Sequence, residues 1–240
     1  MPGKAESPRR IALAGETVPY VLVRARRRSI GLSIDHRGLR VGAPHAATLA
    51  QIEALLLQHA DWVLDKLRHW QARGDTEPFA IVEGARLPWL GGELTLSLNE
   101  RGSRHAWSED GQRLNLALAG RATPVTALQR ALRERVRSVL ASRLTRFAAV
   151  LGVPTPPLAL SSARTRWGSC NSRGEIRLNW RLGFFPLHLI DYVVAHELAH
   201  LKEMNHSPRF WAVVESLCPD WRQRRVELRQ RAANLPIFEE

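Results

Sequence analysis

The sequence predicts an α+β fold, and two kinds of residue pattern support this prediction. Short stretches in which apolar and polar residues alternate, separated by turn residues such as Gly and Asp, predict β-strands between residues 18 and 118. Stretches with apolar residues three or four positions apart predict helices over about residues 48–68, 123–151 and 187–201. We therefore expect two domains, an N-terminal accessory α+β region over residues 1–120 and a second domain over residues 121–240.

The accessory region begins with residues 1–10, which are polar and which we expect to be disordered. Short strands follow, then a helix with Thr48 as its N-cap, and finally two hairpins with Gly-containing turns. The expected strands cover residues 18–24, 29–34 and 39–42, and the expected hairpins cover 86–98, turning at Gly91-Gly92, and 105–118, turning at Asp110-Gly111. No internal repeat is visible in the sequence.

The second domain is expected to combine a backing helix, a small antiparallel sheet, a central helix and a C-terminal helix. The expected elements, in order, are a helix opened by Thr123-Pro124, a strand pair over 158–163 and 175–181, the helix over 187–201, and a helix opened by Ser207-Pro208. Alternation in the strand over 175–181 gives it one apolar and one polar face. If this strand borders a cleft, it could pair with an extended peptide.

The most informative motif lies on the expected helix over 187–201 and reads HExxH, followed five residues later by a third His. His196 and His200 are four residues apart, about 40° around a helix, so one metal ion can accept both imidazoles. Glu197, about 100° from His196, is placed to act as a base on a water molecule rather than as a ligand. His206, in the turn before Ser207, is the nearest candidate for the third ligand. Three protein ligands and an open fourth position are typical of catalytic zinc sites.

The sequence contains other residues that could take part in the metal site. Glu215, on the following helix, is the rival third ligand, because some zinc enzymes use a downstream Glu. Cys170 would be redundant as a ligand or nucleophile, since the set of His and Glu is already complete. Metzincins share the spacing of the three histidines, but their motif requires Gly where this chain has Glu203, and a later methionine turn that the chain cannot form.

Composition favours a protein that is neither membrane-spanning nor secreted. No stretch approaches the ~20 apolar residues of a membrane helix, and the N-terminus lacks the apolar core of a signal peptide. With only two cysteines, the cytoplasm is the expected location. The net charge of +12 makes nucleic acid a candidate partner, although a biased genome composition would produce the same excess of Arg. Composition gives no indication of oligomeric state.

Several segments together resemble one protein family. They are Arg166-Trp167-Gly168-Ser169-Cys170, Glu175-Ile176-Arg177-Leu178-Asn179-Trp180, the HELAH helix, Asn205-His206-Ser207-Pro208-Arg209-Phe210-Trp211 and Cys218-Pro219-Asp220. They are similar to the YgjP-like metallopeptidases, which are related to the SprT-like and Wss1-like zincins. The resemblance implies a zincin-like catalytic domain with Zn²⁺ bound by His196, His200 and His206 and with Glu197 as the base.

The function expected from these features is zinc-dependent hydrolysis, most simply of a peptide or protein. One alternative is a metal-dependent phosphohydrolase acting on nucleotides, which the excess of Arg would suit. Another is a DNA-associated protease, or a nucleic-acid-binding protein with a structural zinc. Arg166, Ser169 and Asn179 are candidates either for substrate contact or for structural hydrogen bonds.

Overall fold

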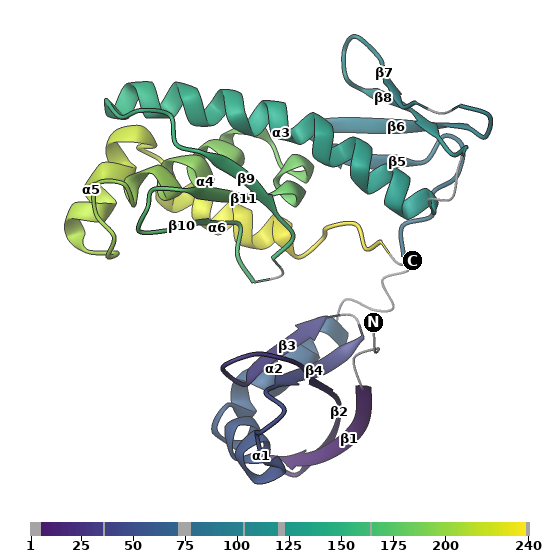
Figure 1. Cartoon of the computed structure of the whole chain (residues 1–240), viewed down its shortest axis with the longest axis vertical. Coiled ribbons are helices and arrows are strands. Elements are labelled where there is room, and N and C mark those ends of the chain that lie inside the picture. The colour runs from purple at the N-terminus through teal and green to yellow at the C-terminus, as the bar shows by residue number, and fades with distance from the viewer. Residues whose placement is uncertain are drawn as a thin grey trace. The chain divides into compact units, whose positions relative to one another are not determined.

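The chain forms two compact units, Met1–Glu77 and Pro78–Glu240 (Figure 1). The computed structural model describes residues 6–35, 37–71, 78–102, 104–119, 123–163 and 165–238. Each unit encloses its own cluster of buried apolar side chains. This division differs from the expected boundary at residues 120 and 121, because the two hairpins expected in the accessory region pack into the core of the second unit.

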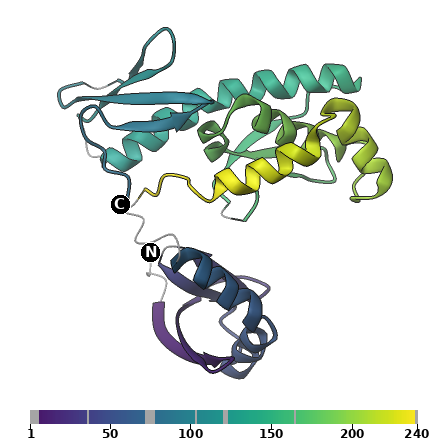
Figure 2. The same ribbon diagram turned by 180° about the vertical axis from the view of Figure 1, so that it is seen from behind.

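The first unit is a four-stranded sheet with two helices on one face (Figure 2). Its elements are β1 (Glu6–Leu13), β2 (Glu16–Arg24), β3 (Gly31–Asp35), β4 (Gly38–Ala43), α1 (Leu49–Gln58) and α2 (Ala60–Gln71). Residues 1–10 were expected to be disordered. Residues 1–5 lie outside the described residues, and for residues 6–10 the expectation was wrong: they belong to β1, where backbone pairing with β2 orders a stretch that lacks an apolar pattern. The single helix expected after Thr48 is divided at His59, whereas the cap itself is confirmed, with a capping box to Gln51.

The second unit begins with another four-stranded sheet and a long helix. Both expected hairpins are present, although the first turns at Leu90-Gly91 rather than at Gly91-Gly92. The helix is capped by Thr123 and ends at Gly152, as expected. Its elements are β5 (Arg86–Trp89), β6 (Gly92–Asn99), β7 (Ala106–Trp107), β8 (Arg113–Ala117) and α3 (Pro124–Leu151).

The two four-stranded sheets share one topology. Their orders are β1-β2-β4-β3 and β5-β6-β8-β7, with a parallel pair in the centre and an antiparallel pair on each side. The first hairpin of each sheet turns through two residues with positive φ, Ala14-Gly15 in one and Leu90-Gly91 in the other. A type I′ turn requires this conformation. The chain therefore contains a structural repeat that its sequence does not reveal.

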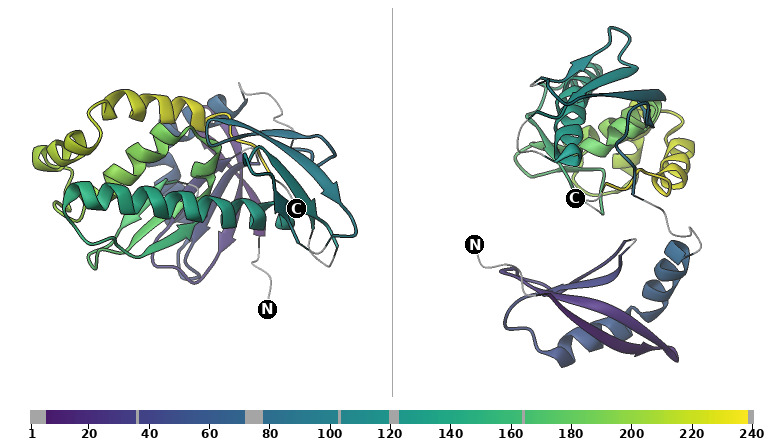
Figure 3. Two further views of the ribbon diagram at one scale, coloured as in Figure 1. Left: turned by 90° about the horizontal axis from the view of Figure 1, so that it is seen from above. Right: turned by 90° about the vertical axis from the view of Figure 1, so that its right-hand side faces the viewer.

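The rest of the second unit builds a central helix into a layered core. Its elements are β9 (Leu158–Ser161), β10 (Gly168–Cys170), β11 (Ile176–Asn179), the 3₁₀ helix η1 (Trp180–Phe184), α4 (Leu187–Ala199), α5 (Pro208–Leu217) and α6 (Trp221–Ala232). Helix α4 lies between α3 and α6 (Figure 3). The sheet is mixed rather than wholly antiparallel, since β11 pairs antiparallel with β10 and parallel with β9. These elements confirm the α+β class and the backing helix, small sheet, central helix and C-terminal helices.

Helix α4 is held on nearly all sides, which fixes the residues that it carries. Its Leu189, Ile190, Val194 and Leu198 are fully buried. Each such aliphatic side chain contributes roughly 1.5–3 kcal/mol on burial. The chain entering α4 is fixed by the first hairpin of this unit, where the Leu90 N–H donates to the Gly183 carbonyl at 2.8 Å. Among the described residues, no helix is both long and apolar enough to span a membrane.

Candidate active site

The three histidines of the motif converge at the C-terminal end of α4. His196 lies in the last turn of this helix and His200 forms its C-cap, and the chain then reverses through a tight turn to His206. The Ser207 hydroxyl, which caps α5 by accepting a hydrogen bond from the Phe210 N–H, fixes the end of that turn. As a result the Nε2 atoms of His206 and His196 lie 3.2 Å apart, and one nitrogen from each histidine lies within 4.8 Å of the others.

This arrangement fits a zinc ion. Zn–N bonds of about 2.0–2.1 Å at tetrahedral angles place two ligand nitrogens about 3.3–3.4 Å apart, close to the His196–His206 separation. Burial lowers the pKa of His196 to about 3, with His200, His206 and Arg225 adding to the effect, and burial likewise lowers the pKa of His200. The two imidazoles are therefore neutral at physiological pH, which is the form that binds a metal.

Aromatic side chains of α5 hold the three imidazole rings in position. Phe210 is fully buried, and its ring centroid lies 4.9 Å from that of His196 and 4.6 Å from those of His200 and His206. Trp211 also packs on the cluster, 5.8 Å from His196 and 5.9 Å from His206. Trp221 stacks on Trp211 at 4.1 Å. The three imidazoles are thus fixed by packing, including that of His206, whose own side chain is exposed.

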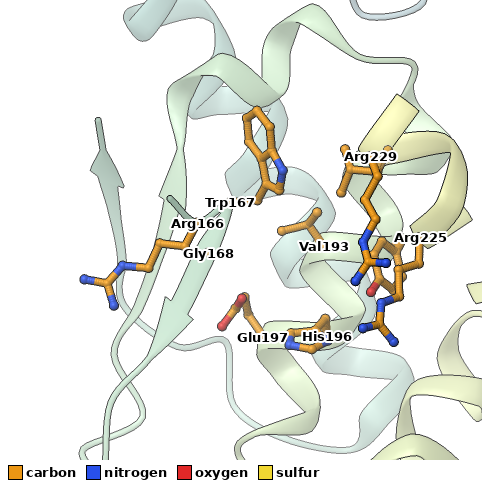
Figure 4. A pocket seen from close by; sticks show the side chains of 10 residues that line it. Arg166, Trp167, Gly168, Val193, His196, Glu197, Arg225 and Arg229 are labelled. Carbon is orange, nitrogen blue, oxygen red and sulfur yellow. The ribbon is translucent and has the colours of Figure 1, made fainter. Parts of the chain in front are cut away.

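Glu197 lies beside this cluster with its side chain only 5% exposed. Its carboxylate is directed toward the N-terminal end of β10, where Gly168 has no side chain (Figure 4). A Cβ at position 168 would lie 2.5 Å from Glu197 Cγ, so only glycine leaves room for this rotamer. Burial raises the pKa of Glu197 to about 8, and the nearby Arg166 opposes the shift. A cation at the imidazole cluster would favour the ionised form, which is the form that acts as a base.

A cleft of about 240 Å³ opens beside Glu197 and His196 (Figure 4). One wall is Trp167 and Gly168 at β10, the floor is α4, and the opposite wall is α6. The T-shaped packing of Trp167 on Phe185, with centroids 5.0 Å apart, fixes the first wall. A substrate group in this cleft would lie directly against the candidate base.

The strand that borders the cleft is β10, not the strand expected over residues 175–181. That segment contains β11, which is the middle strand of the order β10-β11-β9 and is paired on both sides. On either side of β10, the Trp167 carbonyl accepts from the Asn179 N–H and the Asn171 N–H donates to the Glu175 carbonyl, so both groups face the β11 side. Because residues of an antiparallel strand alternate between inward and outward bonding, the polar backbone groups of Gly168 and Cys170 face the free edge.

The other residues considered from the sequence lie as follows. Glu215 is exposed and pairs with Arg222 at 2.7 Å, outside the group of histidines that could hold a metal. Asn179 is structural: its side chain donates to the carbonyls of Ala163 and Arg166 and accepts from the Arg181 N–H. Ser169 pairs with Arg177 across β10 and β11.

The two cysteines are both free thiols. Burial, together with the nearby Glu197, raises the pKa of Cys170, so that thiol is not set up as a nucleophile.

Sequence reasoning missed the packing role of Phe210 and Trp211 and the cleft residues of α6. The packing role of Phe210 and Trp211 was indicated by their position as an aromatic pair shortly after Ser207-Pro208. Nothing in the local sequence indicated which residues of α6 line the cleft.

One family model and two solved structures match this chain. The family model described as "YgjP-like, metallopeptidase domain" matches residues 28–231. Among solved structures, the metallopeptidase zymogen of Pyrococcus abyssi abylysin is 21% identical, with a TM-score of 0.37 over 41% of this chain and 99% of its own. The metallopeptidase zymogen of Methanocaldococcus jannaschii jannalysin is 17% identical, with a TM-score of 0.35 over 38% of this chain and 95% of its own. No curated protein gives a significant match. Since the family model covers most of the chain, including parts of both compact units, the chain belongs to the YgjP-like metallopeptidase family.

Proposed function

We propose that this protein is a zinc-dependent peptidase in which His196, His200 and His206 bind the metal and Glu197 is the general base. The observation that carries the proposal is the convergence of three imidazole nitrogens within 4.8 Å, beside a buried carboxyl group that lines a cleft. Membership of a metallopeptidase family supports the choice of peptide as substrate.

The residues divide the chemistry between them. A zinc ion, when bound, supplies a Lewis acid that polarises the scissile carbonyl and acidifies water. Glu197 accepts a proton from the attacking water, and the resulting carboxylic acid donates that proton to the leaving amine nitrogen. Because Glu197 is buried between α4 and β10, little rotamer freedom has to be lost before it acts.

The free edge of β10 offers a way to hold the substrate. An extended peptide that pairs with the outward N–H and carbonyl groups of Gly168 and Cys170 would run past Glu197 as an added strand. Backbone pairing of this kind favours a peptide over a nucleotide, so it argues against the phosphohydrolase alternative.

The test is a set of purified variants assayed for zinc content and for hydrolysis of an unfolded protein. Glu197→Gln should keep its zinc and lose about 10²–10⁴-fold in kcat/KM, the usual contribution of a general base. His196→Ala and His206→Ala should both lose zinc. His188→Ala is the matched control, since His188 lies on the same helix, pairs with Glu227 and should keep both metal and activity.

Three outcomes would contradict the proposal. Unchanged turnover in Glu197→Gln would remove the base from the mechanism. Full zinc occupancy in His206→Ala would move the third ligand elsewhere. Hydrolysis of nucleotides without any hydrolysis of unfolded protein would replace the peptidase with a phosphohydrolase.

A further inference from the structure

Two arginines of α6, Arg225 and Arg229, line the cleft opposite Trp167 and are four residues apart, so they project from the same face of the helix (Figure 4). Their ion pairing differs from that of the other arginines on α6. Within the part of the chain that the structure describes, neither has a carboxylate partner, whereas the other three arginines of the helix are paired. The pairs are Arg222–Glu215 at 2.7 Å, Arg224–Asp220 at 2.8 Å and Arg231–Glu227 at 2.7 Å.

The guanidinium of Arg225 is held in place by an aromatic ring. Its central carbon lies 5.4 Å from the centroid of Trp211, the same indole that packs against His196 and His206. Arg225 and His196 line the same cleft, so this guanidinium lies near the imidazole cluster. Arg229, one turn further along, is exposed at the rim. Both arginines come from α6, so the pair lies on one side of the cleft.

The remaining lining of the cleft is largely apolar. Trp167, Val193 and Leu228 supply apolar surface, Arg166 is a third arginine of the lining, and Glu197 is its one acidic residue. A ligand that fits this lining has a short aliphatic stem, which contacts the apolar walls, and an anionic end, which reaches the guanidiniums. Planar guanidinium groups bind planar carboxylates through two parallel hydrogen bonds, which makes a carboxylate the best-matched anion on a peptide.

We propose that Arg225 and Arg229 bind a carboxylate of the peptide substrate next to the scissile bond. This inference rests on the proposed peptidase function and adds a substrate preference to it. The carboxylate has two possible sources, an Asp or Glu side chain and the C-terminus of the peptide. The first would make the protein an endopeptidase selective for acidic residues, and the second would make it a carboxypeptidase.

Binding can be measured without turnover in the full-length, zinc-loaded Glu197→Gln protein. Three heptapeptides of Ala, Gly and Leu serve as probes in isothermal titration. One has a central Glu and blocked termini, one has Gln instead of Glu and blocked termini, and one has Gln and a free C-terminal carboxylate. At least one peptide with a carboxylate should bind about tenfold more tightly than the blocked Gln peptide, and the tighter of the two identifies the source.

Substitution of the arginines then connects the preference to the cleft. In the Arg225→Gln/Arg229→Gln double variant the preference should fall below about twofold. Arg222→Gln, which removes a paired guanidinium on the same helix, is the matched control and should leave the preference intact. Arg229→Gln alone changes an exposed side chain, so it provides a folded variant if loss of the Arg225 contact with Trp211 disturbs the double variant.

The outcomes separate this inference from the proposed function. Equal affinity for the three peptides, absence of binding at millimolar concentration, or a preference that survives the double variant would overturn the carboxylate site. Hydrolysis of both blocked peptides by the wild-type protein, without such a preference, would leave the peptidase intact and remove only its selectivity. If the protein prefers a peptide with a carboxylate but the wild type hydrolyses none of the peptides, the carboxylate-binding site is retained and the proposed peptidase function is refuted.

Discussion

Gly168→Ala tests whether the position of Glu197 against β10 matters for hydrolysis. The substitution adds one methyl group to an edge strand and leaves the three histidines untouched. The added Cβ would lie 2.5 Å from Glu197 Cγ and 2.6 Å from Cδ, whereas carbon atoms in contact normally lie about 3.5–4.0 Å apart. Since β10 is held by its ladder to β11, the side chain of Glu197 is the part that must move.

The size of the effect follows from these distances. Relief of the overlap requires a displacement of about 1 Å at the carboxyl group of Glu197. A misplacement of that size costs about 10²-fold in rate when the displaced group acts on the reacting atoms. Overpacking in a well-packed region also costs about 1–3 kcal/mol of folding stability. We therefore expect kcat/KM to fall about 10²-fold while the zinc content stays at the wild-type level.

The assay combines peptide hydrolysis, zinc content and thermal denaturation of the purified variant. Gly92→Ala is the matched control, because a Cβ at that position meets no closer atom than the Trp89 carbonyl oxygen at 3.8 Å, and its activity should not change. Activity of Gly168→Ala within threefold of wild type, at about the expected stability, would refute the reasoning about Glu197. Loss of zinc in the same variant would show that the damage reaches the histidines instead.

Three further predictions concern stability. Phe210→Ala removes a fully buried ring that contacts all three histidines, so it should lower the free energy of unfolding by about 3–5 kcal/mol and weaken zinc binding, as measured by denaturant titration with and without zinc. Residues 78–240 enclose their own core and should fold and bind zinc without the first unit, which circular dichroism and zinc analysis of that fragment would check. Burial raises the pKa of Asp191 above its ordinary 3.8, against the opposing effect of Arg143, so the folded protein holds this proton more tightly than the unfolded chain. The free energy of unfolding should therefore fall as pH rises above that value, and Asp191→Asn should flatten this dependence in urea titrations across pH.

The candidate metal site was predictable because its geometry is local. His196, Glu197 and His200 lie on one helix, where sequence spacing fixes their angular positions. Even His206 follows from local signals, because the end of α4 and the Ser207-Pro208 cap leave it in a short turn. Neither signal depends on contacts with distant parts of the chain.

The organisation of the chain was less predictable because it depends on contacts between distant segments. The strand β1 is ordered by pairing with β2, and nothing in its own polar sequence requires it to be a strand. The hairpins of β5–β8 look the same in sequence whichever helix covers them, and their packing against α3 and η1 assigns them to the second unit. For the same reason the shared topology of the two sheets is visible in strand order but not in residue identity.

The cleft shows why substrate preference is harder to read than metal binding. Trp167, Val193 and Arg229 meet there from the residue before β10, from α4 and from α6, and each is more than twenty positions from the next along the chain. In the sequence, Arg225 and Arg229 are two of many arginines on a strongly basic helix. They become distinctive only in three dimensions, because the other arginines of α6 have acidic partners and these two face the cleft instead. On α6, therefore, the basic excess of the chain leaves two guanidiniums without a carboxylate partner among the described residues, and both line the cleft that Glu197 also lines.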